Sequence, residues 1–189
     1  MKNIVFLPAA AIALLAGVAS PACAQVALAA PSASAPAANA SSVKLFGDWG
    51  VRCFAAPAHA PCEMQEAVTE KKNGARILGV SIALAPAQGR YIFQLAVPLG
   101  VSLAKGAKIE ASNYSAPAMA YRRCDRGGCY VEGLIDGKVI DALARSAPSA
   151  KVEIAAMDGR TVDLPFSLRG FADARKDMEE RSHGKPTKP

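Results

Sequence analysis

The sequence predicts an all-β protein, an antiparallel β-sandwich with two short helices. Two observations support this fold class. Between residues 45 and 168 the hydrophobic side chains recur with a period of two, which places them on one face of a strand. Glycine and proline residues separate these runs, so the strands are expected to be short and numerous, as in known sandwiches.

Two pairs of alternating segments are expected to form β-hairpins. Residues 78–84 and 91–97 alternate on either side of a turn that contains proline and glycine. Residues 152–156 and 162–166 alternate on either side of Asp158-Gly159, a dipeptide typical of a type I′ turn. Further strands are expected at 45–54, 62–69, 108–112, 118–124 and 129–132.

Two segments depart from the strand pattern. Apolar residues near 137–146 lie at helical spacing, and Pro148 follows them, which predicts a short helix across one end of the sandwich. A second helix is expected near 172–181. It falls in the charged C-terminal segment, residues 173–189, whose end we expect to be frayed.

Length and composition exclude several classes of protein. The 189 residues include 22 Lys or Arg and 16 Asp or Glu, for a net charge of +6. This length suits one domain, expected at 44–172 after a flexible tether of Ala, Pro and Ser at 25–43. Because the apolar share is concentrated near the N-terminus, a polytopic membrane protein is excluded. Nucleic-acid binding is not expected, since no aromatic residues accompany a basic groove.

The N-terminus has the pattern of a secretory signal peptide, residues 1–24. A lysine precedes an apolar run at 4–18, and Ala22-Cys23-Ala24 fits a small-x-small cleavage site. We therefore expect export to the periplasm, with outer-membrane association or secretion left open, and no transmembrane span in the mature chain. Lipidation of Cys23 is the alternative, although the residues before it lack the usual aliphatic side chain.

The cysteines are expected to form two disulfides in an oxidising compartment. Four remain once Cys23 leaves with the signal peptide, and four cysteines allow three connectivities. The short spacings favour Cys53–Cys62 and Cys124–Cys129, each worth roughly 2–3 kcal/mol in the chain-entropy model. Nearby arginines would favour thiolate at the second pair, so a redox role is the alternative, although the spacing is not C-x-x-C.

Several ordered motifs together resemble one protein family. They are Phe46-Gly47-Asp48-Trp49 followed by Cys53, Pro61-Cys62-Glu63-Met64-Gln65, Val97-Pro98-Leu99-Gly100-Val101, Tyr121 before Cys124, Gly128-Cys129 and Leu164-Pro165-Phe166-Ser167-Leu168-Arg169-Gly170-Phe171. Across residues 44–172 the chain is similar to the invasion-associated locus B family of bacterial envelope proteins. The resemblance implies an exported, immunoglobulin-like β-sandwich with a role in host-cell invasion or in the envelope, and it carries over no catalytic residue, ligand or cofactor.

Some of these motifs admit a functional as well as a structural interpretation. Trp49 is expected to be a core anchor beside the first disulfide rather than a ligand platform. The residues Val97, Pro98, Leu99 and Val101 form either an apolar partner patch or a bend. We favour the bend, which would place Leu99 and Val101 in the core.

Three arginines form the candidate binding site. Arg122, Arg123 and Arg126 surround the Cys124–Cys129 turn, which would hold their guanidinium groups where phosphates or carboxylates can bind them. This chemistry suggests anionic lipid, lipopolysaccharide or sulfated host surface glycans as partners. From these residues alone, a solvated basic turn without a partner is the favoured interpretation.

We expect a non-enzymatic envelope protein that binds a macromolecular partner of unknown identity. The alternative is a periplasmic hydrolase acting on envelope polymers, in which carboxylates such as Asp48 and Glu63 converge in space. Because no second carboxylate or histidine lies near Asp48 in sequence, we expect Asp48 to cap local backbone. His59 and His183 lack ligand spacing to another His or Cys, so no metal or cofactor is expected.

Overall fold

A computed structural model describes residues 43–54, 60–146 and 148–183. The expected signal peptide with Cys23, nearly all of the expected tether, His59 and residues 184–189 lie outside the described residues.

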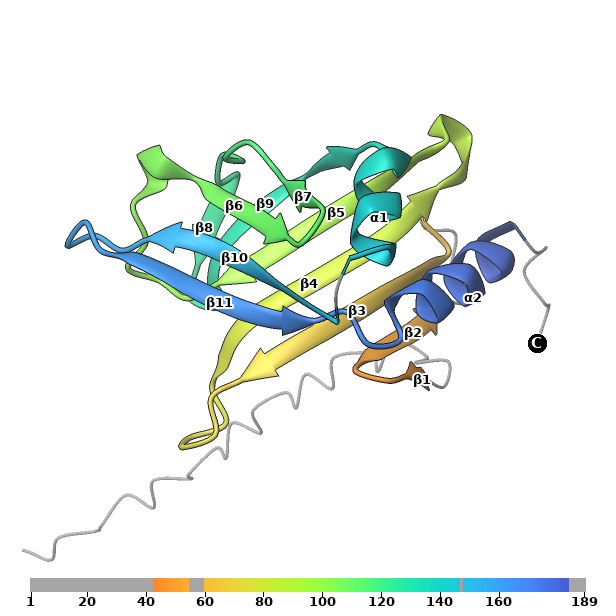
Figure 1. The fold of residues 1–189 in the computed structure, drawn as a ribbon, viewed down its shortest axis with the longest axis horizontal. Helices are drawn as coiled ribbons and strands as arrows, with labels where there is room; N and C mark the ends of the chain where they lie inside the picture. Colours follow the sequence, from red (N-terminus) through yellow and green to blue (C-terminus); the bar gives the residue numbers. More distant parts are fainter. Residues whose placement is uncertain (1–42, 55–59, 147, 184–189) are drawn as a thin grey trace, which may run out of the picture. The chain divides into compact units, whose positions relative to one another are not determined.

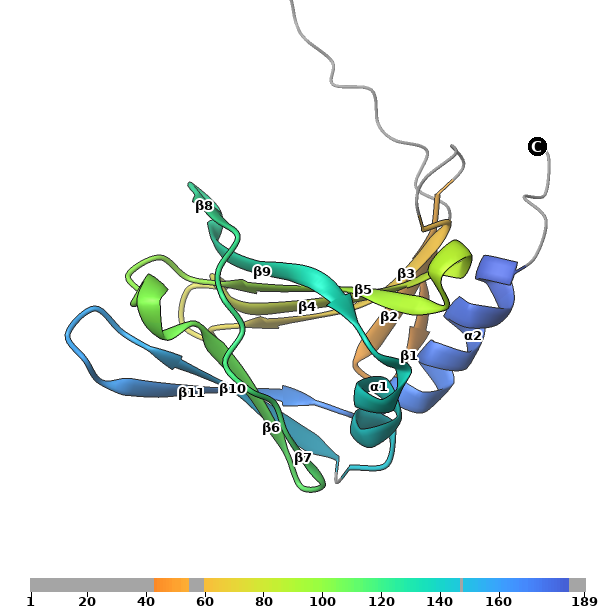
Figure 2. The same ribbon diagram turned by 90° about the horizontal axis from the view of Figure 1, so that it is seen from above.

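The described chain forms two antiparallel sheets around a hydrophobic core (Figure 1; Figure 2). The larger sheet has seven strands in the order β1-β2-β3-β4-β5-β9-β8, and the smaller has four in the order β11-β10-β6-β7. The strands are β1 (Lys44–Phe46), β2 (Trp49–Cys53), β3 (Cys62–Thr69), β4 (Arg76–Ala85), β5 (Arg90–Val97), β6 (Ala107–Ala111), β7 (Tyr114–Ser115), β8 (Arg123–Asp125), β9 (Gly128–Ile135), β10 (Ser149–Ala155) and β11 (Thr161–Ser167). The expected antiparallel sandwich is confirmed.

The hairpin expected at 78–84 and 91–97 is present near the centre of the larger sheet. It consists of β4 and β5, joined through the short 3₁₀ helix η1 (Pro86–Gln88). Ile82 and Phe93 lie directly opposite each other, and both are buried. The period-two pattern therefore correctly identified the residues that face the core, whose burial contributes about 25 cal/mol per Å² of apolar surface.

The hairpin expected at 152–156 and 162–166 is present as β10 and β11, but its turn differs from the expected type. The Ala156 amide donates to the Arg160 carbonyl, and the Gly159 amide donates to the Ala156 carbonyl. Three residues rather than two therefore lie in the loop. Gly159, with a φ of 86°, occupies the left-handed position that a three-residue hairpin loop requires.

Two expected strands are wrong in extent. The run 45–54 divides into β1 and β2, because Gly47 adopts a φ of 57° and the chain turns back on itself there. The run 118–124 is mostly not a strand, since Met119 makes only an isolated bridge and β8 begins at Arg123. Alternation predicts which side chains face inward, but it does not supply the neighbouring strand with which an extended segment must pair.

Both expected helices are present, as α1 (Gly137–Ala144) and α2 (Phe171–His183). Figure 1 shows α2 across β2 and β3, where it contacts the larger sheet. Its buried face includes Phe171, Ala174 and Met178. Arg175 of α2 pairs with Asp141 of α1 at 2.5 Å, and this ion pair links the two helices. Arg175 also pairs with Glu179 of its own helix at 2.6 Å. Within the described residues, no helix has the length and apolar character needed to cross a bilayer.

Trp49 is a core anchor, as expected. It is fully buried, and its ring meets that of Phe171 edge-on with 5.0 Å between the ring centroids. Its indole nitrogen donates a hydrogen bond to the Ser167 carbonyl oxygen at 3.0 Å. Trp49 therefore joins the start of the larger sheet to the end of the smaller one and to α2.

Candidate functional site

Both expected disulfides, Cys53–Cys62 and Cys124–Cys129, are present. Each joins residues directly opposite each other on neighbouring antiparallel strands, β2 with β3 and β8 with β9. Cys62 and Cys129 are buried, whereas Cys124 is exposed. Each bond therefore closes a local hairpin rather than linking distant parts of the chain.

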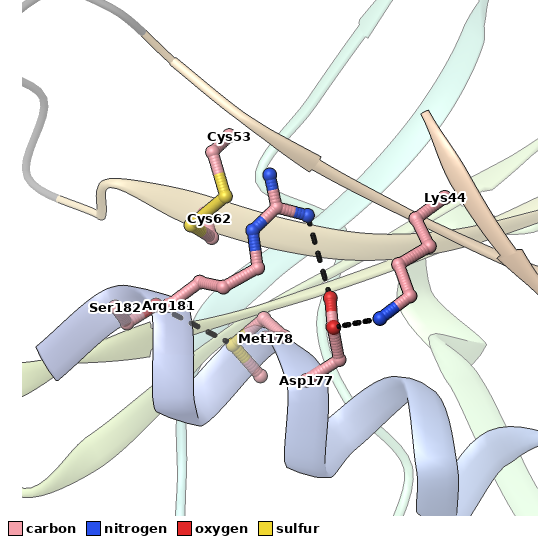
Figure 3. The surroundings of a disulfide bond; sticks show 7 residues. All are labelled: Lys44, Cys53, Cys62, Asp177, Met178, Arg181 and Ser182. Atoms are coloured by element: carbon pink, nitrogen blue, oxygen red, sulfur yellow. Dashed lines mark hydrogen bonds and ion pairs between the residues drawn. A yellow bond between two sulfur atoms is a disulfide. The ribbon is translucent and has the colours of Figure 1, made fainter. Parts of the chain in front are cut away.

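The first disulfide lies beside α2 (Figure 3). There the Asp177 carboxylate pairs with Lys44 of β1 at 2.6 Å and with Arg181 of α2 at 3.3 Å. These contacts fasten the first strand to the last helix. The surroundings of the first disulfide are therefore those of a structural link.

The second disulfide lies at the β8–β9 turn, where one of the three predicted arginines is already engaged. The Arg123 guanidinium forms ion pairs with Asp125 and, at 3.0 Å, with Glu132. It also lies 3.8 Å from the centroid of the Tyr130 ring. The expectation that all three guanidinium groups face a partner is therefore wrong for Arg123, because two carboxylates and a ring already surround it.

The other two arginines are available. Arg122 and Arg126 are exposed, and neither has a carboxylate partner among the described residues. Arg76, at the start of β4, donates a hydrogen bond to the Gly127 carbonyl oxygen at 3.2 Å and adds a cation beside this turn. Sequence reasoning missed Arg76, because only the order of the strands brings the start of β4 to the β8–β9 turn.

Residues 97–101, between β5 and the 3₁₀ helix η2 (Leu103–Lys105), divide between core and surface. Val97 and Val101 are buried, whereas the side chain of Leu99 is 57% exposed. The expectation that Leu99 enters the core is wrong. The strand ends before residue 98, and Gly100 has a φ of 89°, so the period-two alternation is interrupted at Leu99.

Three connecting segments gather at the end of the sandwich that lies opposite α1 and α2 (Figure 2). We call this the helix-free end, because neither α1 nor α2 lies there; its one helical turn is the 3₁₀ helix η2. It comprises residues 98–106, residues 122–128, which contain β8 and the turn into β9, and the β10–β11 turn at 156–160. Two contacts establish that these segments touch. The Met157 amide donates to the Gly100 carbonyl at 2.9 Å, and a Cβ on Gly128 would lie 3.9 Å from the Cα of Pro98.

The carboxylates considered for hydrolysis each have an arginine partner. Asp48 accepts two hydrogen bonds of 2.9 Å from Arg169, and these hold the pKa of Asp48 below its usual value. Glu63 pairs with Arg52 at 2.6 Å. The expected backbone cap is also wrong, because the Asp48 carboxylate binds a side chain 121 residues away.

A third carboxylate, Glu66 of β3, was missed by sequence reasoning. It is 8% exposed and lines a cleft of about 320 Å³ between β3 and the end of β11. Its Oε1 accepts a hydrogen bond from the Ser167 amide at 3.0 Å, while Oε2 has no hydrogen-bond partner within the described part of the chain. Burial raises the pKa of Glu66 to about 7. The burial of Glu66 could have been predicted from its position two residues after Met64, on the inward face of β3.

The family model "Invasion associated locus B (IalB) protein" matches residues 49–179. The chain belongs to the IalB family. The matched span begins at Trp49 and ends within α2, so it contains both disulfides and all of the helix-free end. All of the motifs that suggested the IalB family lie within this span, except that the first one begins three residues before it, at Phe46.

Two curated relatives of the IalB family come from Brucella abortus. The chain is 28% identical over 148 residues to the invasion protein B homolog of strain 2308, covering 78% of this chain and 84% of the relative. The homolog from biovar 1, strain 9-941, matches to the same extent. Both relatives are named for invasion.

A solved structure shows the same fold. The crystal structure of invasion associated protein B from Bartonella henselae matches with a TM-score of 0.67 at 20% sequence identity. The match covers 76% of this chain and 100% of the solved chain. The arrangement of strands is therefore shared with an IalB protein at low sequence identity.

Proposed function

We propose that this IalB family member is a non-enzymatic interaction module of the bacterial envelope that binds anionic surfaces through its helix-free end. The observation that supports the proposal is the position of Arg122 and Arg126. Both are exposed, Arg126 in the turn closed by the disulfide and Arg122 directly before β8, and neither has a carboxylate partner among the described residues. A guanidinium group held in this way can bind a phosphate, sulfate or carboxylate through two parallel hydrogen bonds.

The β8–β9 turn is well suited to present these arginines. The disulfide closes the hairpin, and Arg123 joins its two strands through Asp125 and the ring of Tyr130. The amide of Gly127 donates a hydrogen bond of 2.7 Å to the Asp125 carboxylate. A restrained turn loses less conformational entropy on binding than a flexible loop does, so more of the interaction energy remains as affinity.

The proposed location follows from the secretory signal pattern and from the family. We place the protein in the periplasm, associated with the outer membrane or secreted. The anionic groups available there are the phosphates of lipids and lipopolysaccharide, and the sulfates of host glycans. A contribution to host-cell invasion is supported by the names of the Brucella relatives.

The alternative function, a periplasmic hydrolase, has one observation in its favour. Glu66 lines a cleft and has a pKa of about 7, which suits a general acid. Most glycoside hydrolases need a second carboxylate opposite the acid, and Asp48 is bound to Arg169. Hydrolysis of purified cell-wall polymers by the wild type, abolished in Glu66→Gln, would support this alternative.

Binding to heparin and to vesicles containing phosphatidylglycerol tests the proposed function. The variant Arg122→Ala/Arg126→Ala should bind both surfaces roughly 30-fold more weakly, since each basic residue near an anionic surface contributes about 1 kcal/mol. Rising salt should weaken wild-type binding. The matched control is Lys138→Ala/Lys176→Ala, which removes equal charge from exposed positions on α1 and α2. Equal retention of the arginine variant and the control would refute the proposal.

A further inference from the structure

Three of the most exposed large apolar side chains of the described residues lie at the helix-free end. Leu99 is 57% exposed, Leu103 is 58% exposed and Met157 is 80% exposed. Scattered exposed leucines are normal on a soluble domain. A group on adjoining segments that are far apart in sequence calls for an explanation.

Backbone hydrogen bonds hold these three residues in place. Besides the bond between Met157 and Gly100, the Ser102 amide donates to the Ala155 carbonyl at 2.8 Å. Val101, whose own side chain is buried, pairs with Ala156 in a β-bridge. The segment that carries Leu99 and Leu103 is thus fastened to the turn that carries Met157, so the apolar group is part of the fold.

Cations flank this apolar group. Lys105 lies two residues after Leu103 in η2 and is exposed, and it has no ion-pair partner among the described residues. Arg126 lies in the β8–β9 turn and Arg122 lies directly before β8, while Gly128 at the end of this turn packs against the backbone of Val97 and Pro98. The acidic residues of the two turns are already neutralised, because Asp125 pairs with Arg123 and Asp158 pairs with Arg160 at 2.7 Å.

We propose that the helix-free end docks on an anionic phospholipid bilayer. Leu99, Leu103 and Met157 enter the boundary between headgroups and acyl chains, while Lys105, Arg122 and Arg126 contact lipid phosphates. This inference rests on the proposed function and assigns its surface. Apolar insertion combined with attraction to anionic lipid is the usual basis of reversible attachment to a bilayer surface.

The mixture of side chains favours a bilayer over a soluble polyanion. A sulfated glycan would engage only the cations, and the three apolar side chains would stay in water. A bilayer matches both features at once, since its phosphates lie directly above an apolar layer.

The first experiment measures cosedimentation of the purified, oxidised protein with vesicles of phosphatidylcholine, with and without phosphatidylglycerol. The variant Leu99→Ser/Leu103→Ser/Met157→Ser should bind the anionic vesicles at least about tenfold more weakly and should bind heparin normally. The control Leu45→Ser/Leu134→Ser removes exposed leucines from β1 and β9, outside the helix-free end, and should bind as the wild type does.

The second experiment detects insertion directly and does not depend on weakened binding. Trp49 is fully buried, so a tryptophan introduced by Leu103→Trp reports on its own surroundings. Brominated acyl chains in anionic vesicles should quench the fluorescence at position 103. They should not quench a tryptophan placed by Leu45→Trp.

The outcomes separate the two proposals. If the serine variant binds anionic vesicles like the wild type and position 103 is not quenched, insertion is overturned. The proposed function still stands in that case if Arg122→Ala/Arg126→Ala loses binding to heparin and vesicles. If the arginine variant keeps all binding, the proposed function fails. If only a protein partner binds this end, the bilayer proposal fails.

Discussion

Gly47 lies against Arg169, since a Cβ on Gly47 would be 2.6 Å from the Arg169 carbonyl oxygen. The same oxygen accepts a hydrogen bond of 3.2 Å from the Asp48 amide. On the other side of the contact, a Cβ on Gly170 would be 2.0 Å from the Phe46 carbonyl oxygen. The β1–β2 turn therefore meets the β11–α2 turn backbone to backbone, which explains why glycine occurs in both motifs.

The first prediction concerns this contact. Gly47→Ala should lower the free energy of unfolding by about 2–4 kcal/mol. The added methyl group would clash with the Arg169 carbonyl oxygen, and alanine is strained at a φ of 57°. The control is Gly89→Ala, where φ is 61° but no atom lies within 4 Å of the new Cβ, with an expected cost of about 1 kcal/mol. Urea unfolding measures both. Equal losses would mean that the close approach contributes nothing.

The second prediction concerns Glu66 and pH. The native pKa of about 7 exceeds the ordinary 4.5, so the native state binds a proton more tightly than the unfolded state. Stability should therefore fall as pH rises from about 4.5 to about 7, by up to about 3 kcal/mol, and level off above that. Glu66→Gln should remove this slope and be more stable than the wild type at pH 8.

Denaturant unfolding across this pH range measures the effect. Glu63→Gln is the matched control on the same strand, where the carboxylate has Arg52 as a partner, and it should keep the wild-type slope. A slope that persists in Glu66→Gln would show that another group is responsible.

The third prediction concerns Trp49. Trp49→Phe should keep an aromatic ring near Phe171 but lose volume and the hydrogen bond to Ser167, at a cost of about 2 kcal/mol. Circular dichroism during urea unfolding avoids dependence on tryptophan fluorescence. Phe54→Leu changes a half-exposed aromatic and should cost less than about 0.5 kcal/mol. Similar costs for the two variants would argue against Trp49 as an anchor.

The fourth prediction separates the roles of the disulfides. Removing either pair by Cys→Ala replacement should lower stability by roughly 2–3 kcal/mol in the chain-entropy model. Only loss of Cys124–Cys129 should also weaken binding to heparin, because that bond restrains the turn that carries Arg122 and Arg126. Salt-dependent elution from heparin, under conditions where both variants are folded, provides the measurement. Weakened binding in the Cys53–Cys62 variant alone would contradict the assignment.

The sequence by itself determined the features that depend on local patterns. Alternation predicted the β4–β5 and β10–β11 hairpins, and the short spacings predicted both disulfides. The ordered motifs were sufficient to recognise the IalB family. These features involve residues close together in the chain, so spacing and residue type specify them without knowledge of the sheet order.

The tertiary structure decided which of the predicted site residues are available to bind a partner. Arg123 is engaged, whereas Arg122 has no carboxylate partner in the described part of the chain, and Leu99 is exposed beside Met157. Glu66 receives its hydrogen bond from Ser167, 101 residues away. Such contacts depend on which strands become neighbours and how closely two sheets approach. Alternation can mark which side chains face inward, but no local pattern could predict these partners, because ion pairs and hydrogen bonds between distant residues form through space rather than along the chain.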